Sequence, residues 1–310
     1  MMIQHAKETT NQGSNLVRLV ILSDTHNRHK AVHKLLPPPD KQNNNTPSIL
    51  LHCGDFADRG SLQHVRSFCR WLSRDESQYP ALPLHFQHVV LVDGNHDRAR
   101  PPAPVIDLSK EFAKCNQKIQ ENGIQRQVHF LQDDSVVLHG LKIHGVSWKS
   151  VENDDFSALL QQEQKPDVLL SHLGPYFSKQ ERKVAVGLDT KRDIDFRKWR
   201  GSRALTEAAN SLDISLVLSG HVHWGRGAVF LPPNEDNNND TGSWFINAAS
   251  TKPGYKKYDR SSVGQQQVTP PVIVYYDTQK RRVAHLSCPP HDAVGGEIHE
   301  WTLCNGSAKA

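Results

Sequence analysis

Short apolar runs recur along most of the chain, separated by polar or glycine-containing segments. The runs lie at residues 16–22, 49–51, 88–92, 136–146, 168–170 and 216–218. Their nearly continuous Val, Leu and Ile content predicts β-strands that are buried on both faces, as in a sheet that helices cover.

Helical spacing occurs between some of these runs. Residues 203–212 carry apolar side chains three and four positions apart, and Ser202 before them is a suitable N-cap. Residues 62–72 give a second helical pattern. Later apolar runs predict hairpins, at 228–231, 244–248, 272–276 and 282–286. This order of elements predicts an α/β fold, a mixed β-sandwich flanked by helices, in a single domain.

The expected domain spans residues 16–288. Two Pro- and Asn-rich segments, 37–47 and 232–240, cannot pack into a core and are expected to be loop insertions. Residues 1–15 are expected to be a disordered N-terminus. Residues 289–310, rich in Gly and His, are expected to form a poorly ordered C-terminal tail.

The composition narrows the class of protein. No apolar run approaches the ~18 residues of a membrane span, and six Trp and ten Phe in 310 residues can build a core. A net charge of +4 predicts neither a nucleic-acid nor a membrane partner. Five scattered cysteines give no disulfide framework, and the N-terminus lacks a secretory signal, so we expect a cytoplasmic protein.

Polar residues follow five of the predicted strands directly. Because the carboxyl ends of strands line the functional crevice of α/β sheets, we expect these side chains to meet at one edge. They are Asp24, His26, Asp55, Asn95, His96, Asp97, His172, His221 and His223.

This set of side chains suits a pair of divalent metal ions. Carboxylates mixed with neutral imidazoles favour Mn, Fe, Zn or Ni over Ca or Mg, whose sites are nearly all oxygen. Asp-x-His and His-x-His place both side chains on one side of an extended segment, as chelation requires. If two ions sit about 3.5–4 Å apart, one carboxylate must bridge them, and Asp55 is the natural candidate.

The ordered blocks D-x-H, G-D, G-N-H-D, H and G-H-x-H, between Asp24 and His223, resemble the signature of the calcineurin-like metallophosphoesterases. All five blocks are present in order. The flanking sequences ILSDTHNRH, LLHCGDFADRG and FINAAS are most similar to the MPPED-like branch of small metallophosphodiesterases.

The resemblance implies two metal sites and a mechanism. The first ion would be held by Asp24, His26, Asp55 and His223, and the second by Asp55, Asn95, His172 and His221. His96 would donate a proton to the leaving oxygen, and Asp97 would orient the His96 ring. A metal-activated hydroxide would attack phosphorus in line. Arg59 matches a phosphate-binding arginine of the protein phosphatase branch; the alternative is an exposed arginine in a turn.

The implied function is hydrolysis of phosphate esters, with phosphodiesters favoured by family likeness. The alternatives are a phosphomonoesterase acting on proteins or small molecules, and a non-catalytic scaffold on the same fold. The presence of His96 and of every ligand favours an enzyme. Of the 18 histidines, five are given roles in this scheme and 13 are not.

Overall fold

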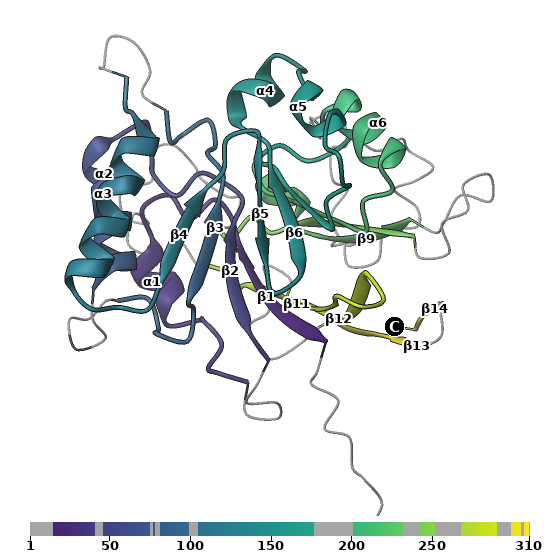
Figure 1. Ribbon diagram of the computed structural model, residues 1–310, viewed down its shortest axis with the longest axis horizontal. Helices are drawn as coiled ribbons and strands as arrows, with labels where there is room; N and C mark the ends of the chain where they lie inside the picture. The colour runs from purple at the N-terminus through teal and green to yellow at the C-terminus, as the bar shows by residue number, and fades with distance from the viewer. Residues whose placement is uncertain are drawn as a thin grey trace, which may run out of the picture.

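The computed structural model describes residues 15–40, 46–74, 77, 81–98, 105–176, 201–231, 242–251, 268–289, 299–304 and 307–309. Within them, two mixed β-sheets pack face to face, and helices cover their outer faces (Figure 1). The predicted mixed α/β sandwich is confirmed.

The larger sheet has eight strands in the order β14-β13-β12-β11-β1-β2-β3-β4. Its parallel part contains the early strands, β1 (Leu16–Leu22), β2 (Ser48–His52), β3 (His88–Leu91) and β4 (Gln127–Phe130). Its antiparallel part contains β11 (Val272–Asp277), β12 (Arg282–Cys288), β13 (His299–Cys304) and β14 (Ser307–Lys309).

The smaller sheet has six strands in the order β5-β6-β7-β8-β10-β9. Its strands are β5 (Asp134–Leu138), β6 (Leu141–Gly145), β7 (Val168–Leu170), β8 (Leu216–Ser219), β9 (Gly227–Leu231) and β10 (Ser243–Asn247). The central strands β6, β7, β8 and β10 run parallel, so their carboxyl ends share one edge.

The helices form two groups. Beside the larger sheet lie α1 (His29–His33), α2 (Leu62–Ser73) and α3 (Leu108–Glu121), and beside the smaller sheet lie α4 (Trp148–Glu152), α5 (Ser157–Leu160) and α6 (Arg203–Ser211). The Ser202 hydroxyl accepts a hydrogen bond from the Leu205 amide at 3.1 Å, which confirms the predicted N-cap of α6. None of the described helices is long and apolar enough to cross a bilayer.

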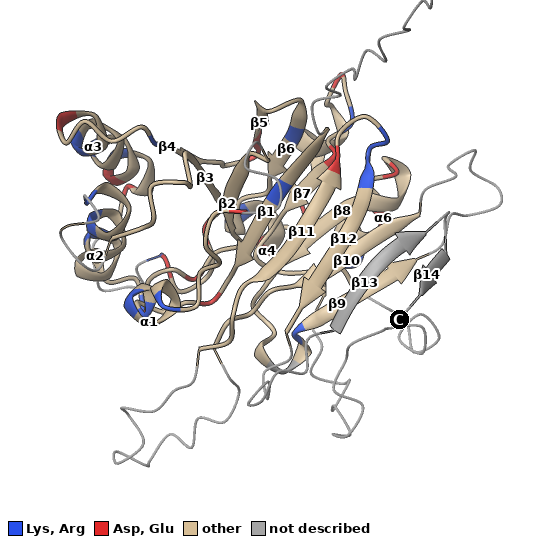
Figure 2. Cartoon of the chain, turned by 90° about the horizontal axis from the view of Figure 1, so that it is seen from below, with Lys and Arg blue, Asp and Glu red and all other residues tan. Residues whose placement is uncertain are grey.

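Three apolar layers hold the sandwich together. One lies between the sheets, and one lies between each sheet and its helices. Strand β3 shows how a central strand contributes to two layers: Val90, and Val92 just after the strand, face the other sheet, whereas Val89 and Leu91 face the helices. Charged residues lie mainly on helices and loops, leaving the sheets largely without them (Figure 2). Burial on both faces explains the continuous apolar runs.

One sequence expectation is corrected. Residues 136–146 form parts of two antiparallel strands, because His139 and Gly140 both take positive φ, 51° and 78°, and turn the chain back. In the tail, residues 299–304 and 307–309 pair beyond β12 as sheet strands, and the poor order expected for the tail stays a prediction.

The remaining expectations concern hairpins, further helices and strands, and the loop and terminal segments. The hairpins β9–β10 and β11–β12 are confirmed. Strand β4 and helix α3 were not predicted. Residues 1–14, 41–45 and 232–240 lie outside the described residues. They contain most of the expected N-terminus, part of the first expected insertion and all of the second.

Candidate metal centre

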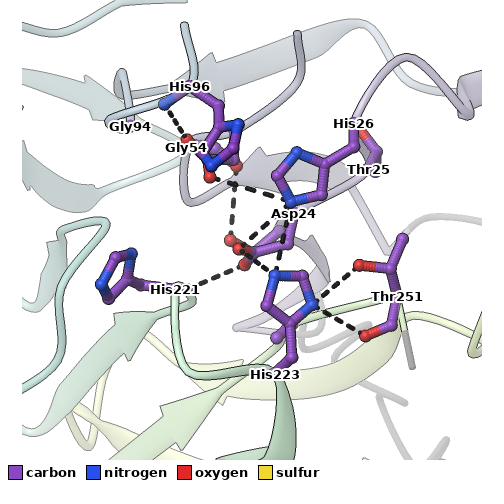
Figure 3. A network of polar contacts seen from close by, with 12 residues as sticks. Asp24, Thr25, His26, Gly54, Gly94, His96, His221, His223 and Thr251 are labelled. Atoms are coloured by element: carbon purple, nitrogen blue, oxygen red, sulfur yellow. Dashed lines mark hydrogen bonds and ion pairs between the residues drawn. The ribbon is translucent and has the colours of Figure 1, made fainter. Parts of the chain in front are cut away.

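The polar residues that follow the strands come together at one edge of the sandwich. β1, β2 and β3 of the larger sheet lead to three of the polar blocks, and β7 and β8 of the smaller sheet lead to the other two. Figure 3 shows His26, His221 and His223 arranged around Asp24, with His96 at the periphery. Both sheets therefore contribute to a single site.

The backbone at this edge is strained. Asp24, His26, Asp55 and His221 all have positive φ, between 41° and 65°, in the left-handed region that favours glycine. Such conformations persist in non-glycine residues when the surroundings impose them, and they concentrate at functional sites. The sharp turns bring side chains from five loops to one point.

Two glycines allow the chains to approach closely. A Cβ on Gly94 would lie 2.2 Å from Asp55 Oδ1, and one on Gly220 would lie 2.3 Å from Asp24 Oδ2. These are the glycines of the G-N-H-D and G-H-x-H blocks. They leave room for the backbone amides of His96 and His221 to donate to those same oxygens, at 2.8 and 2.9 Å.

One group of ligand atoms surrounds Asp24. The Nε2 atoms of His26 and His223 lie 3.4 Å apart, and His223 Nε2 lies 3.4 Å from Asp24 Oδ1. These three ligand atoms are all within 4.8 Å of one another. Asp24 Oδ1 is buried and accepts no hydrogen bond, so a cation would satisfy it.

A second group surrounds His172. Its Nε2 atom lies 3.3 Å from Asp55 Oδ2 and 3.2 Å from Asn95 Oδ1, and His221 Nδ1 lies 3.1 Å from the same amide oxygen. Two nitrogens that bind one tetrahedral ion at 2.0–2.1 Å lie about 3.3–3.4 Å apart. The spacing of these side chains therefore fits a metal ion. The structure brings the predicted ligands together at one place, in overlapping groups of Asp24 with His26 and His223, Asp55 with His26 and His96, and Asp24 with Asp55 and His172. Their division between two ions stays a prediction.

Asp55 belongs to both groups. Its Oδ2 atom lies 3.8 Å from His26 Nε2 on one side and 3.3 Å from His172 Nε2 on the other. Among the described residues, histidines are the ion-pair partners of Asp24 and Asp55. In the part of the chain that the structure describes, neither buried carboxylate pairs with a Lys or Arg, which makes the site attractive to cations.

Hydrogen bonds to backbone carbonyls fix the orientation of two of the ligand rings. His172 Nδ1 donates to the Cys53 carbonyl at 2.7 Å, and His223 Nδ1 donates to the Thr251 carbonyl at 2.9 Å. Since a carbonyl can only accept, the proton lies on Nδ1 and the lone pair of each neutral ring lies on Nε2, facing the site. The ring of Trp148 packs against both His172 and His221, with centroids 5.5 Å from each. Neither Thr251 nor Trp148 was predicted from the sequence to have a role at the site.

Charges at the site are strongly coupled. Burial disfavours a charged His172, but the charge of Asp55 and its hydrogen bond outweigh burial and raise the pKa of His172 to about 10. Burial also raises the pKa of Asp55, but His172 and the other histidines more than compensate and lower it. Burial and the neighbouring His172 lower the pKa of His221 to about 4. A cation that binds here takes the place of the His172 proton.

The contacts of His96 correct one expectation. Its Nδ1 atom lies 3.2 Å from Asp58 Oδ1, and its ring lies edge-on to His26, with centroids 4.9 Å apart. Asp97 is buried and accepts hydrogen bonds from three backbone amides, those of Ala57, Asp55 and Gly94, at 2.7–2.8 Å. The contact predicted for Asp97 is therefore made by Asp58, and Asp97 instead ties the loop after β2 to the loop after β3.

Asp58 was overlooked although the motif contains it. It is the second aspartate of GDFADRG, three residues after Asp55. Arg59 is 86% exposed, and its Nε atom lies 4.0 Å from Asp58 Oδ2. The structure thus brings Arg59 to the rim of the site, and its contact with a substrate stays a prediction.

Comparisons with known proteins agree with this arrangement. The family model described as calcineurin-like phosphoesterase matches residues 17–225. Human metallophosphoesterase domain-containing protein 1 is 27% identical over 141 residues, 43% of this chain and 37% of the human protein. A UPF0046 protein of Caenorhabditis elegans is 24% identical over 290 residues, 85% of this chain and 76% of the worm protein. The chain thus matches well under two thirds of the length of the human relative.

Among solved structures, a purple acid phosphatase from yellow lupin gives a TM-score of 0.44 at 13% identity, covering 96% of this chain and 53% of that one. The phosphopantetheinyl hydrolase of Mycobacterium tuberculosis gives 0.43 at 16% identity, covering 83% and 96%. The family model spans more than half of the chain and all five strand-end blocks. The chain belongs to the calcineurin-like phosphoesterase family.

Proposed function

We propose that this protein is a metal-dependent phosphoesterase that hydrolyses phosphodiesters at the strand-end site. The observation that carries the proposal is the convergence of two buried carboxylates with histidine nitrogens at 3.3–3.4 Å, which leaves Asp24 Oδ1 without a hydrogen bond. Family membership supports the reaction class.

Two divalent ions fit the residues that are present. One would be held by Asp24, His26, Asp55 and His223, and the other by Asp55, Asn95, His172 and His221. Asp55 would be shared by both ions, because its Oδ2 atom lies 3.8 Å from His26 Nε2 and 3.3 Å from His172 Nε2. When bound, the ions would polarise the phosphoryl group and lower the pKa of a water molecule. Mn, Fe, Zn and Ni all suit this donor set.

The protein itself supplies the proton for the leaving group. His96 has a side chain that is 34% exposed, so a substrate can reach it beside the ligands. Asp58 accepts from Nδ1 of the His96 ring, which leaves Nε2 to donate to the leaving oxygen. Asp58 is a positioning residue in this scheme. Asp97 keeps the two loops that carry Asp55 and His96 together.

The charge of the rim favours diesters over monoesters. A monoester carries up to two negative charges at neutral pH, whereas a diester carries one. Arg59, through Asp58, is the one Lys or Arg among the described residues with an ion pair to the side chains of the site. As far as the described residues go, the few cations beside the site suit the substrate with the smaller charge.

The test uses the full chain loaded with Mn²⁺, with bis-p-nitrophenyl phosphate and p-nitrophenyl phosphate as substrates. We expect turnover of both, with the higher kcat/KM for the diester. Faster turnover of the monoester would instead support a phosphomonoesterase. No turnover of either ester, with two ions demonstrably bound, would support the non-catalytic scaffold.

A further inference from the structure

Three histidines without a role in the strand-end site gather at the opposite end of the sandwich. His88 is the first residue of β3, His129 lies in β4, and His139 forms the turn between β5 and β6. This is the amino end of β3, whereas the strand-end site follows its carboxyl end. The cluster is therefore separate from the site already described.

The three rings come from both sheets. Along β3 and β4, Val89 and Val128 face the helices, so His88 and His129 face the other sheet by the alternation of a strand. The turn that carries His139 joins two strands of that other sheet, whose Leu138 and Leu141 lie in the core between the sheets. The histidines thus lie on or beside β4 and β5, the outermost strands of the two sheets at this side.

One distance between the rings is that of two ligands on a metal ion. His88 Nδ1 lies 3.4 Å from His129 Nε2, which is the separation of about 3.3–3.4 Å expected for two nitrogens on one tetrahedral ion. The same 3.4 Å separates His26 from His223 at the strand-end site. It exceeds the ~2.9–3.0 Å of an ordinary hydrogen bond from an N–H group. The ring of His139 lies 5.4 Å from that of His88, centroid to centroid.

The rings are chemically ready to bind a metal. Burial lowers the pKa of His88, and burial together with His88 lowers the pKa of His129 to about 4, so both rings are neutral at pH 7. The described contacts of this cluster are with imidazoles, not carboxylates. Imidazole ligands select Zn, Cu, Ni or Fe and disfavour Mg and Ca.

We propose that His88 and His129, completed by His139, form a second metal site that takes a single Zn²⁺ ion and links the two sheets. His139 has to rotate, because the described groups with three ligand atoms within 4.8 Å of one another all lie at the strand-end site. Its ring is exposed and sits in a two-residue turn. It also lines a cavity of about 450 Å³, together with Asp40 and His85.

The first experiment measures Zn²⁺ bound per chain in the full-length protein, by competition with a chromogenic chelator. We expect the His88→Gln/His129→Gln double variant to bind one ion fewer than wild type. His139→Gln is expected to retain the ion with at least about tenfold weaker affinity. The matched control is His285→Gln, a half-buried histidine of β12, which should bind as wild type does.

This difference of one ion does not depend on the strand-end site, because wild type and variants share that site. Diester turnover of the Mn²⁺-loaded protein should be unchanged in the double variant, which also shows that it folds. Equal Zn²⁺ binding by wild type and the double variant would overturn the proposal.

A second measurement needs no variant. Crystals of wild-type protein soaked in Zn²⁺ should give an anomalous difference peak between His88 Nδ1 and His129 Nε2 at the zinc absorption edge. The absence of a peak there, in crystals that show zinc elsewhere, would also overturn the proposal.

Discussion

Histidines cluster at both ends of the β-sandwich, but they contact carboxylates at one end and other histidines at the other. At the carboxyl ends of the strands, His172 and His223 lie 3.3 and 3.4 Å from the buried carboxylates of Asp55 and Asp24. At the amino end, the described contacts of His88 and His129 are with other histidines. Histidines alone therefore do not distinguish a reactive centre from a structural one.

The two ends differ in net charge once metal is bound, because, among the described residues, only the strand-end site contains carboxylates. At the strand-end site two carboxylates offset part of the charge of two ions, so both can lie close together. At the amino end a single dication would keep its full charge, because its ligands are neutral. We therefore expect reaction chemistry at one end and cross-linking of the sheets at the other.

The largest expected effect comes from Asp55→Ala. This change removes the ligand shared by both groups and leaves His172 without its carboxylate. We expect the loss of bound metal and a fall in diester turnover greater than the 10²–10³-fold typical of one lost electrostatic contact. Metal analysis and kinetics check this, with exposed Asp155→Ala as the control. If Asp55→Ala still held two ions, the bridging assignment would be wrong.

His96→Ala should separate catalysis from metal binding. The ring lies beside His26 and is proposed to donate a proton, so its loss should reduce kcat about 10²–10⁴-fold. Bound metal should stay at two ions per chain, in contrast to Asp55→Ala. An unchanged kcat for the diester would contradict the acid role of His96.

The paired variants Asp58→Asn and Asp97→Asn test which carboxylate orients the His96 ring and stabilises its protonated form. The hydrogen bond from His96 lowers the pKa of Asp58, so by reciprocity Asp58 stabilises the protonated ring. Asp58→Asn should reduce kcat about tenfold and move the alkaline limb of the pH–rate profile to lower pH. Asp97→Asn should lower thermal stability and leave the position of that limb unchanged. A shifted limb in Asp97→Asn alone would restore the original sequence prediction.

The smallest effect on activity is expected at a buried histidine of neither cluster. His144 of β6 shares a hydrogen bond of 2.9 Å with the Ser135 hydroxyl, and burial lowers its pKa to about 4. Above pH 6.5 the ring is neutral whether the chain is folded or unfolded. As the pH falls from 6.5 to 4, the unfolded chain takes up a proton that the folded chain does not, so stability decreases by up to about 3 kcal/mol.

Urea unfolding at pH 7, 5 and 4 measures this loss. His144→Gln should flatten the dependence of the unfolding free energy on pH over that interval, and His285→Gln should not. Diester turnover at pH 7 is expected to be unchanged in both variants. If the unfolding free energy of wild type and of His144→Gln depended equally on pH, the lowered pKa of His144 would not be the cause of the loss.

The residues of the strand-end site were predictable because their places directly after buried strands determine where they lie in the fold. Each follows a buried run, and the carboxyl ends of parallel strands meet at one edge. The choice between Asp58 and Asp97 was not predictable in this way. It depends on the path of the loop after β2, where Arg59 and Gly60 take positive φ, and spacing does not reveal such turns.

Missed elements have different causes. In α3, Phe112, Cys115 and Ile119 are buried at helical spacing and Asp107 caps the helix at the Lys110 amide, so the signal was present but diluted by lysines and glutamines. Strand β13 was missed because its sequence lacks the signal of a buried strand. It pairs with β12 far from the central strands, and its sequence shows no long apolar run because it lies toward the edge of the sheet.

The strained turns at Asp24, His26, Asp55 and His221 have a consequence for the life of the protein in a cell. Left-handed backbone in non-glycine residues is unfavourable by about 1–3 kcal/mol each, and without metal the two buried carboxylates are offset only by protonated histidines such as His172. Metal ions would offset both terms, since a ligand that binds the folded chain stabilises it. Metal shortage would then reduce the abundance of the protein, as well as its turnover, by leaving more of it open to proteolysis.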